Sequence, residues 1–135
     1  CSKLFQCLLD GGEFDGVRVL EPLTVRRVVA EVGKPEVDRS LLVPLRYSAG
    51  MMLGASPWGL FGPDTSRAFG HLGFANIVVW ADRERDISVA LLNTGKLVAG
   101  IHMPWLLALL GCIGRSCPKL SETAQDKRLA AIGMA

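Results

Sequence analysis

The first third of the chain carries apolar residues at helical spacing. A helix is predicted from Ser2 to Leu9, because apolar residues fall three or four positions apart within it, and Gly11-Gly12 ends it. A second helix is predicted from Pro22 to Val32, since proline is favoured in a first turn and Gly33 follows directly.

The middle of the chain has the pattern of strands separated by turns. Lys34 to Pro44, with two prolines and mixed charge, is interpreted as a surface connection, and Gly54 to Thr65 as a loop. Strands are predicted over three segments rich in β-branched and aromatic residues: about Tyr47 to Leu53, Ala68 or Gly70 to Ala81, and Ile87 to Asn93.

The last two predicted strands form a hairpin around the charged run Asp82 to Asp86, which is expected to be solvated. The apolar return strand, Val89 to Leu92, indicates burial on both faces, so helices should cover each side of the sheet. From Ser121 the composition is polar, and the tail is expected to fray. One covering helix is predicted within Leu97 to Leu120, too short in its apolar part to span a membrane, with an apolar stripe of Trp105, Leu106, Leu109, Leu110 and Ile113.

Composition narrows the classes of function. At 135 residues and 50% hydrophobic, the chain is long enough for one domain core. A net charge of +2, with dispersed basic residues, favours neither nucleic acid nor a membrane surface as a partner. The chain opens on Cys1 without a basic region followed by an apolar run, so no signal peptide is visible.

The cysteines, Cys1, Cys7, Cys112 and Cys117, form no Cys-x-x-Cys pair, and no histidine lies at a zinc-site spacing. Neither a metal site nor a cofactor is expected. Buried or half-buried free thiols are favoured over a disulfide.

The segment Phe69 to Thr94, FGHLGFANIVVWADRERDISVALLNT, resembles the C-terminal hairpin of the superfamily of serine β-lactamases, penicillin-binding proteins and related esterases. The likeness extends from about Lys3 to Lys96, through KLFQCLLDGGEFDGVRVL, EPLTV and RYSAGMML, and more weakly over Cys112 to Leu120. It implies an α+β fold with an antiparallel sheet flanked by helices. Residues 1–120 would form the C-terminal portion of the β-lactamase-like α/β/α sandwich, and residues 121–135 a polar tail.

In this family the first strand of the hairpin carries a Lys-Thr-Gly or His-x-Gly box along one wall of the active site, and the box here is His71-Leu72-Gly73. The resemblance implies that Gly73 keeps the wall open, that the backbone N–H of Phe74 donates to the oxyanion, and that His71 binds substrate or tunes proton transfer. His71 in place of Lys, and Leu72 where Thr is common, favour the esterase-like members. Substrate contacts are assigned to Leu72, Trp58 and Phe61. On general grounds alone, a structural role for His71 and core packing of the two aromatics stay open.

The family's nucleophilic Ser-x-x-Lys and its Tyr box lie upstream of the residues present. Ser116-Cys117-Pro118-Lys119 matches Ser-x-x-Lys, but a proline separates the pair at the end of a predicted helix, so a catalytic role is not assigned. His102 is interpreted as a helix-start or surface residue. Three hypotheses remain: a C-terminal segment of a serine hydrolase, a non-catalytic binding or scaffold relative, or an unrelated α+β domain. The first implies an ester or amide substrate, the missing N-terminal portion of the domain as a partner, and no activity of this chain alone.

Overall fold

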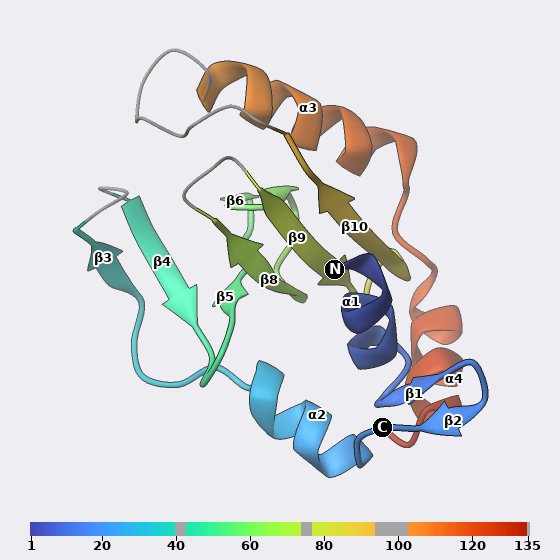
Figure 1. The fold of residues 1–135 in the computed structure, drawn as a ribbon. Helices are drawn as coiled ribbons and strands as arrows, with labels where there is room; N and C mark the ends of the chain where they lie inside the picture. The colour runs from blue at the N-terminus through green and yellow to red at the C-terminus, as the bar shows by residue number, and fades with distance from the viewer. Residues whose placement is uncertain (40–42, 74–76, 94–102, 135) are drawn as a thin grey trace.

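A computed structural model describes residues 1–39, 43–73, 77–93 and 103–134 (Figure 1). Its largest unit is a six-stranded antiparallel sheet with the strand order β10-β9-β8-β5-β4-β3. The strands of this sheet are β3 (Glu36–Asp38), β4 (Val43–Tyr47), β5 (Met52–Leu53), β8 (Ala68–Leu72), β9 (Val78–Asp82) and β10 (Ile87–Leu91). Two short ribbons pair β1 (Glu13–Phe14) with β2 (Val17–Arg18) and β6 (Trp58–Gly59) with β7 (Gly62–Pro63).

Helices cover both faces of the sheet. The described helices are α1 (Ser2–Leu9), α2 (Pro22–Val29), α3 (Met103–Ser116) and α4 (Glu122–Ala131). On one face α1 contacts β9 and β10, and its Phe5 stacks on Phe69 of β8 with the ring centroids 6.3 Å apart. On the other face Leu110 of α3 packs in a core cluster with Trp80 of β9. The expected α+β fold, an antiparallel sheet with helices on both faces, is confirmed.

The helix predicted from Pro22 to Val32 ends at Val29. Ala30 has extended backbone angles, and the N–H of Val32 donates to the carbonyl of Tyr47 at 2.9 Å. The β-branched residues at this end lower the helix propensity, so pairing with the end of β4 replaces the last helical turn.

The single strand predicted over Tyr47 to Leu53 is wrong, because the chain turns within it. The N–H of Ser48 donates to the carbonyl of Met51 at 2.9 Å, and the Ser48 hydroxyl accepts from the N–H of Met51 at 3.0 Å. A hydroxyl that bonds the nearby backbone favours a turn over a continuous strand. The surface connection predicted over Lys34 to Pro44 was also wrong in part, since it holds β3 and the start of β4.

The strand predicted from residue 68 or 70 to 81 is two strands, β8 and β9. Between them the N–H of Gly73 donates to the carbonyl of Ile77 at 2.7 Å, so the chain reverses between these two residues. The hairpin of β9 with β10 is confirmed. Burial of β10 on both faces is not observed: its residues are half-buried throughout, because its outer edge has no partner strand among the described residues.

Helix α3 confirms the covering helix in part, and residues 94–102 lie outside the described residues. Leu106, Leu110 and Ile113 pack against the sheet, whereas Trp105 is 76% exposed and Leu109 is 47% exposed. The apolar stripe is therefore wider than the contact with the sheet, and one apolar side of α3 faces outward.

The polar tail expected from Ser121 is not frayed, because it forms α4. The Ser121 side chain caps this helix by accepting from the N–H of Ala124 at 3.4 Å. Arg128 of α4 forms ion pairs with Asp10 and Asp86, and the Met134 side chain is buried in the core cluster around α1. These contacts join residues more than forty positions apart, so a local composition pattern gives no sign of them.

All four cysteines carry free thiols, as favoured, although Cys1 and Cys112 are exposed rather than buried. Burial raises the pKa of the Cys7 thiol, and the nearby charge of Asp10 raises it further. Among the described residues, no helix has the length and apolar character needed to cross a membrane.

Gly70, in the middle of β8, is expected to be required for the fold. A Cβ there would lie 2.2 Å from the carbonyl oxygen of Val79 and 2.6 Å from the Cα of Trp80, and both atoms belong to backbone that cannot move freely. Gly70→Ala is therefore expected to lower the free energy of unfolding by about 3 kcal/mol, the upper end of the usual cost of overpacking. Chemical denaturation of the complete protein measures this loss.

The matched control for Gly70 is Gly73→Ala. Among the described residues, a Cβ at Gly73 would meet only Ile77, at 3.4 Å from its carbonyl oxygen, which is ordinary van der Waals contact. This variant is expected to change the free energy of unfolding by less than about 1 kcal/mol. Equal stabilities for the two variants would show that the β8–β9 approach at Gly70 is not as close as described.

Candidate active site

His71 is the exposed residue of β8; its four neighbours in the strand are buried. Successive side chains of a strand alternate between the two faces, so His71 shares a face with Phe69, which lies beneath α1. Its cross-strand neighbour is Val79 of β9. Among the described residues, no hydrogen bond or ion pair engages the imidazole. The structure thus presents an exposed histidine near the end of an otherwise buried strand.

Gly73 directly follows β8 and lies beside the turn into β9. Its N–H donates to the carbonyl of Ile77, and Ile77 is the one described residue that a Cβ at this position would contact. The structure places His71 and Gly73 together at one end of β8. Phe74, whose N–H is the predicted oxyanion donor, lies outside the described residues, so that assignment stays a prediction.

Leu72 and Phe61 belong to the core cluster on the face that α3 covers. Phe61 is 2% exposed and stacks on Trp80 with the ring centroids 5.9 Å apart. Since Leu72 follows His71 in the strand, both core residues lie on the opposite face of the sheet from the imidazole. Trp58 is 63% exposed on β6, in the ribbon whose β7 contacts α3. The structure does not bring these three residues to His71, and a substrate contact for them stays a prediction.

Two other sequence features are placed by the structure. Ser116 is the last residue of α3 and is exposed, and Lys119 pairs with Glu84 at 3.0 Å rather than with this serine. His102 lies outside the described residues. Among the described residues, no group of three or more acidic, cysteine or histidine side chains has the geometry of a metal site.

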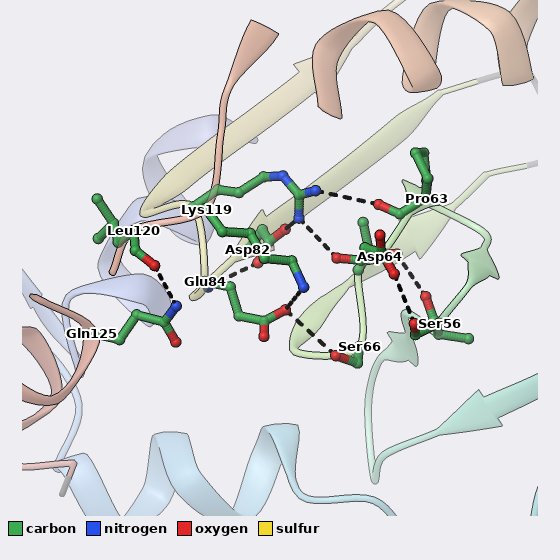
Figure 2. A network of polar contacts seen from close by, with 12 residues as sticks. Ser56, Pro63, Asp64, Ser66, Asp82, Glu84, Lys119, Leu120 and Gln125 are labelled. Atoms are coloured by element: carbon green, nitrogen blue, oxygen red, sulfur yellow. Dashed lines mark hydrogen bonds and ion pairs between the residues drawn. The ribbon is translucent and has the colours of Figure 1, made fainter. Parts of the chain in front are cut away.

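Asp82, at the end of β9, is a buried carboxylate that the sequence pattern did not reveal. Its side chain is fully buried, accepts from the Arg85 guanidinium at 2.7 Å, and accepts from the N–H of Glu84 at 2.9 Å (Figure 2). Arg85 is also buried, with 6% of its side chain exposed. The run Asp82 to Asp86 was predicted to be solvated, and for Asp82 and Arg85 that prediction is wrong.

Arg85 connects the β9–β10 turn to the loop predicted over Gly54 to Thr65. Its Nη1 donates to the carbonyl of Asp64 at 2.9 Å, and the Asp64 carboxylate accepts from the Ser56 hydroxyl at 2.8 Å (Figure 2). Glu84 extends the contacts to the segment before α4, because its carbonyl accepts from the N–H of Leu120 at 2.7 Å. An arginine three residues after an aspartate that ends an apolar strand is the signal that could have indicated this pair.

Comparison with protein-family models gave no match for this chain. Among curated proteins, the chain is similar to the esterase/beta-lactamase LipL of Mycobacterium tuberculosis, with 30% identity over 96 residues. The aligned residues are 71% of this chain and 21% of LipL. This chain therefore aligns with about a fifth of the length of LipL.

Two solved structures share the fold. A novel penicillin-binding protein homolog from Caulobacter crescentus superposes with a TM-score of 0.67 at 26% sequence identity, over 82% of this chain and 29% of the homolog. A family VIII carboxylesterase superposes with a TM-score of 0.64 at 19% identity, over 83% of this chain and 30% of the esterase. In sequence and fold the chain is therefore similar to members of the superfamily of serine β-lactamases, penicillin-binding proteins and related esterases, and it spans less than a third of the length of these relatives.

Proposed function

We propose that this chain forms one wall of the active site of an esterase-like serine hydrolase, which acts on small esters or amides through an acyl-enzyme. The wall is the end of β8, with His71 facing the substrate and Gly73 beside it. The nucleophilic serine, its lysine and the tyrosine come from residues outside this chain.

The exposure of His71 on a buried strand is the observation that carries this proposal. Strand β9 pairs with β8 along its whole length, and β5 pairs with it at Phe69 and Gly70. Because β8 cannot rotate without disrupting these two ladders, the face of the sheet on which His71 lies is fixed. The relatives support the chemistry, since one is named as an esterase/beta-lactamase and another as a carboxylesterase.

Acyl transfer needs the features that this strand end can provide. The tetrahedral intermediate carries an oxyanion, which preorganised backbone N–H groups stabilise, and the proposed donor is the N–H of Phe74. A substrate must approach that N–H closely, and the absent side chain of Gly73 leaves room for it. A neutral imidazole at His71 can donate or accept a hydrogen bond, but it holds a carboxylate less firmly than lysine, which favours neutral esters over carboxylate-bearing lactams.

The 135-residue chain alone is expected not to hydrolyse short-chain p-nitrophenyl esters or a chromogenic cephalosporin, because the proposed nucleophile is absent from it. The complete protein is expected to hydrolyse the esters. Steady-state rates of ester hydrolysis by the two preparations, at equal concentration, measure the difference.

Ser116→Ala is the control for this experiment, because Ser116 is the serine of the Ser-x-x-Lys match. Hydrolysis by the isolated chain that Ser116→Ala abolishes would show that Ser116 is the nucleophile and would contradict the proposal. A complete protein that lacks Ser-x-x-Lys and has no esterase activity would instead support a binding or scaffold role.

A further inference from the structure

A depression of about 190 Å³ lies beside the end of α2 and the start of β8. It is separate from the His71 strand end, since Ala68 and Phe69 border it at the opposite end of the strand. The lining residues that matter for its chemistry are Glu31, Arg46, Ser66, Arg67, Phe69 and Arg83. Three arginines face one glutamate there, which leaves two positive charges without a partner in the lining.

Arg46 is the arginine whose charge is balanced. Its Nε and Nη2 donate to the two carboxylate oxygens of Glu31 at 2.9 and 2.7 Å, and its Nη1 donates to the carbonyl of Gly54 at 2.7 Å. The hydrogen bond from Arg46 lowers the pKa of Glu31. Glu31 is thus committed to Arg46 and does not neutralise the other two arginines.

Arg83 is partly buried and has weak partners. Its guanidinium carbon lies 5.3 Å from the centre of the Phe69 ring, and its Nη2 donates to the thioether sulfur of Met134 at 3.6 Å. Its Nε is buried and has no hydrogen-bond partner in the part of the chain that the structure describes. Among the described residues, no carboxylate pairs with Arg83. A buried N–H without an acceptor is costly, so an acceptor that enters the depression would remove this cost.

Arg67 supplies the second unbalanced charge. It is exposed, and among the described residues no ion pair engages it. It lies close enough to affect Arg83: burial, and secondly the charge of Arg67, lower the pKa of Arg83 to about 10. Arg83 is therefore still a cation at neutral pH, and the two guanidiniums repel each other across the depression.

We propose that Arg67 and Arg83 form a binding site for a small oxyanion of the phosphate or carboxylate class. One anion between the two guanidiniums replaces their repulsion with two attractions and gives the buried Nε of Arg83 an acceptor. Guanidinium N–H groups match the oxygens of phosphate and carboxylate in pairs. The face of the Phe69 ring contacts the Arg83 guanidinium and helps to hold this side chain in place. This site does not depend on the esterase proposal.

The test measures the binding of inorganic phosphate to the complete protein in two ways, by calorimetric titration and by the shift in melting temperature. Sodium chloride at matched ionic strength is the reference, since it screens charge without offering paired oxygens. Saturable phosphate binding that raises the melting temperature is expected for the wild type. A parallel titration with acetate shows whether a planar carboxylate binds as well as a tetrahedral anion does.

Arg67→Gln and Arg83→Met are each expected to weaken phosphate binding by about tenfold or more, the effect of losing one hydrogen bond to a charged group. Methionine keeps an apolar contact with Phe69, and the exposed position of Arg67 makes Arg67→Gln safe for folding. Arg27→Gln is the matched control, because Arg27 is an exposed arginine of α2 outside the depression, and it is expected to bind phosphate as the wild type does.

Two results would overturn this proposal. If the wild type shows no saturable response to phosphate or acetate beyond that to chloride, the site does not take a free anion; this includes the case in which a carboxylate of the protein itself fills it. If Arg67→Gln and Arg83→Met bind phosphate as tightly as Arg27→Gln does, phosphate binds elsewhere on the protein.

Discussion

Gly73→Val is expected to reduce the turnover of a short-chain ester by the complete protein about 100–1,000-fold, the cost of losing an oxyanion donor. The valine side chain would occupy the space that a substrate needs to reach the proposed donor beside Gly73. The fold is expected to survive, because a Cβ at this position meets Ile77 no closer than 3.4 Å. Steady-state turnover at matched folded fraction, with the fold checked by circular dichroism, measures the effect.

His71→Ala is the companion variant, and a smaller loss is expected from it. General acid–base catalysis contributes about 100–10,000-fold to enzyme rates. A residue that only adjusts proton transfer between other groups contributes less than this, so a loss of at least about tenfold is expected. The loss should be larger for ester turnover than for binding of a carboxylate-bearing lactam. Because the His71 side chain is exposed, its removal leaves the core intact.

Gly73→Ala separates an effect on the substrate from an effect on the strand. It adds one methyl group that the described structure accepts, so any loss of turnover reports crowding of the substrate. Unchanged turnover in both Gly73→Val and His71→Ala would place His71-Leu72-Gly73 outside the active site. That result would remove the main support for the proposed function while leaving the family relationship in place.

The elements that the sequence predicted well are those with local signals. Helix α1 has its apolar residues on one side and two glycines at its end, and the β9–β10 hairpin has apolar strands on either side of a charged turn. The turn between β4 and β5 gave a weaker signal in the sequence. It is stabilised by a hydrogen bond from the N–H of Met51 to the Ser48 hydroxyl, and a serine is a weaker turn signal than proline or glycine.

Features that depend on distant residues could not be predicted. A charged run in a sequence predicts solvated side chains, because the sequence does not show which distant carbonyl groups can accept from them. Arg85 donates to the carbonyls of Pro63 and Asp64, more than twenty positions away. The docking of α4 likewise depends on Asp10 pairing with Arg128. At the candidate site, the family likeness indicated His71 and Gly73, but the pattern could not show that Leu72 and Phe61 face the opposite core.

Asp82→Ala is expected to lower the free energy of unfolding by about 3–5 kcal/mol, the usual cost of removing one partner of a buried ion pair. Without the carboxylate, the buried Arg85 guanidinium keeps only neutral carbonyl acceptors, at Asp64 and Pro63. The N–H of Glu84 loses its acceptor as well. Urea unfolding of the complete protein measures the loss.

A double-mutant cycle of Asp82→Ala, Arg85→Met and the double variant separates the interaction energy of the pair from the effect of removing each side chain. Replacing Asp82 with alanine and Arg85 with methionine together removes both buried charges, so the double variant is expected to be more stable than Asp82→Ala alone. Asp126→Ala is the matched control, because Asp126 is an exposed aspartate of α4, and a change within about 0.5 kcal/mol is expected there. A similarly small change in Asp82→Ala would mean that water reaches Arg85 readily. The link from the β9–β10 turn to the loop at Asp64 would then contribute little to the stability of the sheet that carries His71.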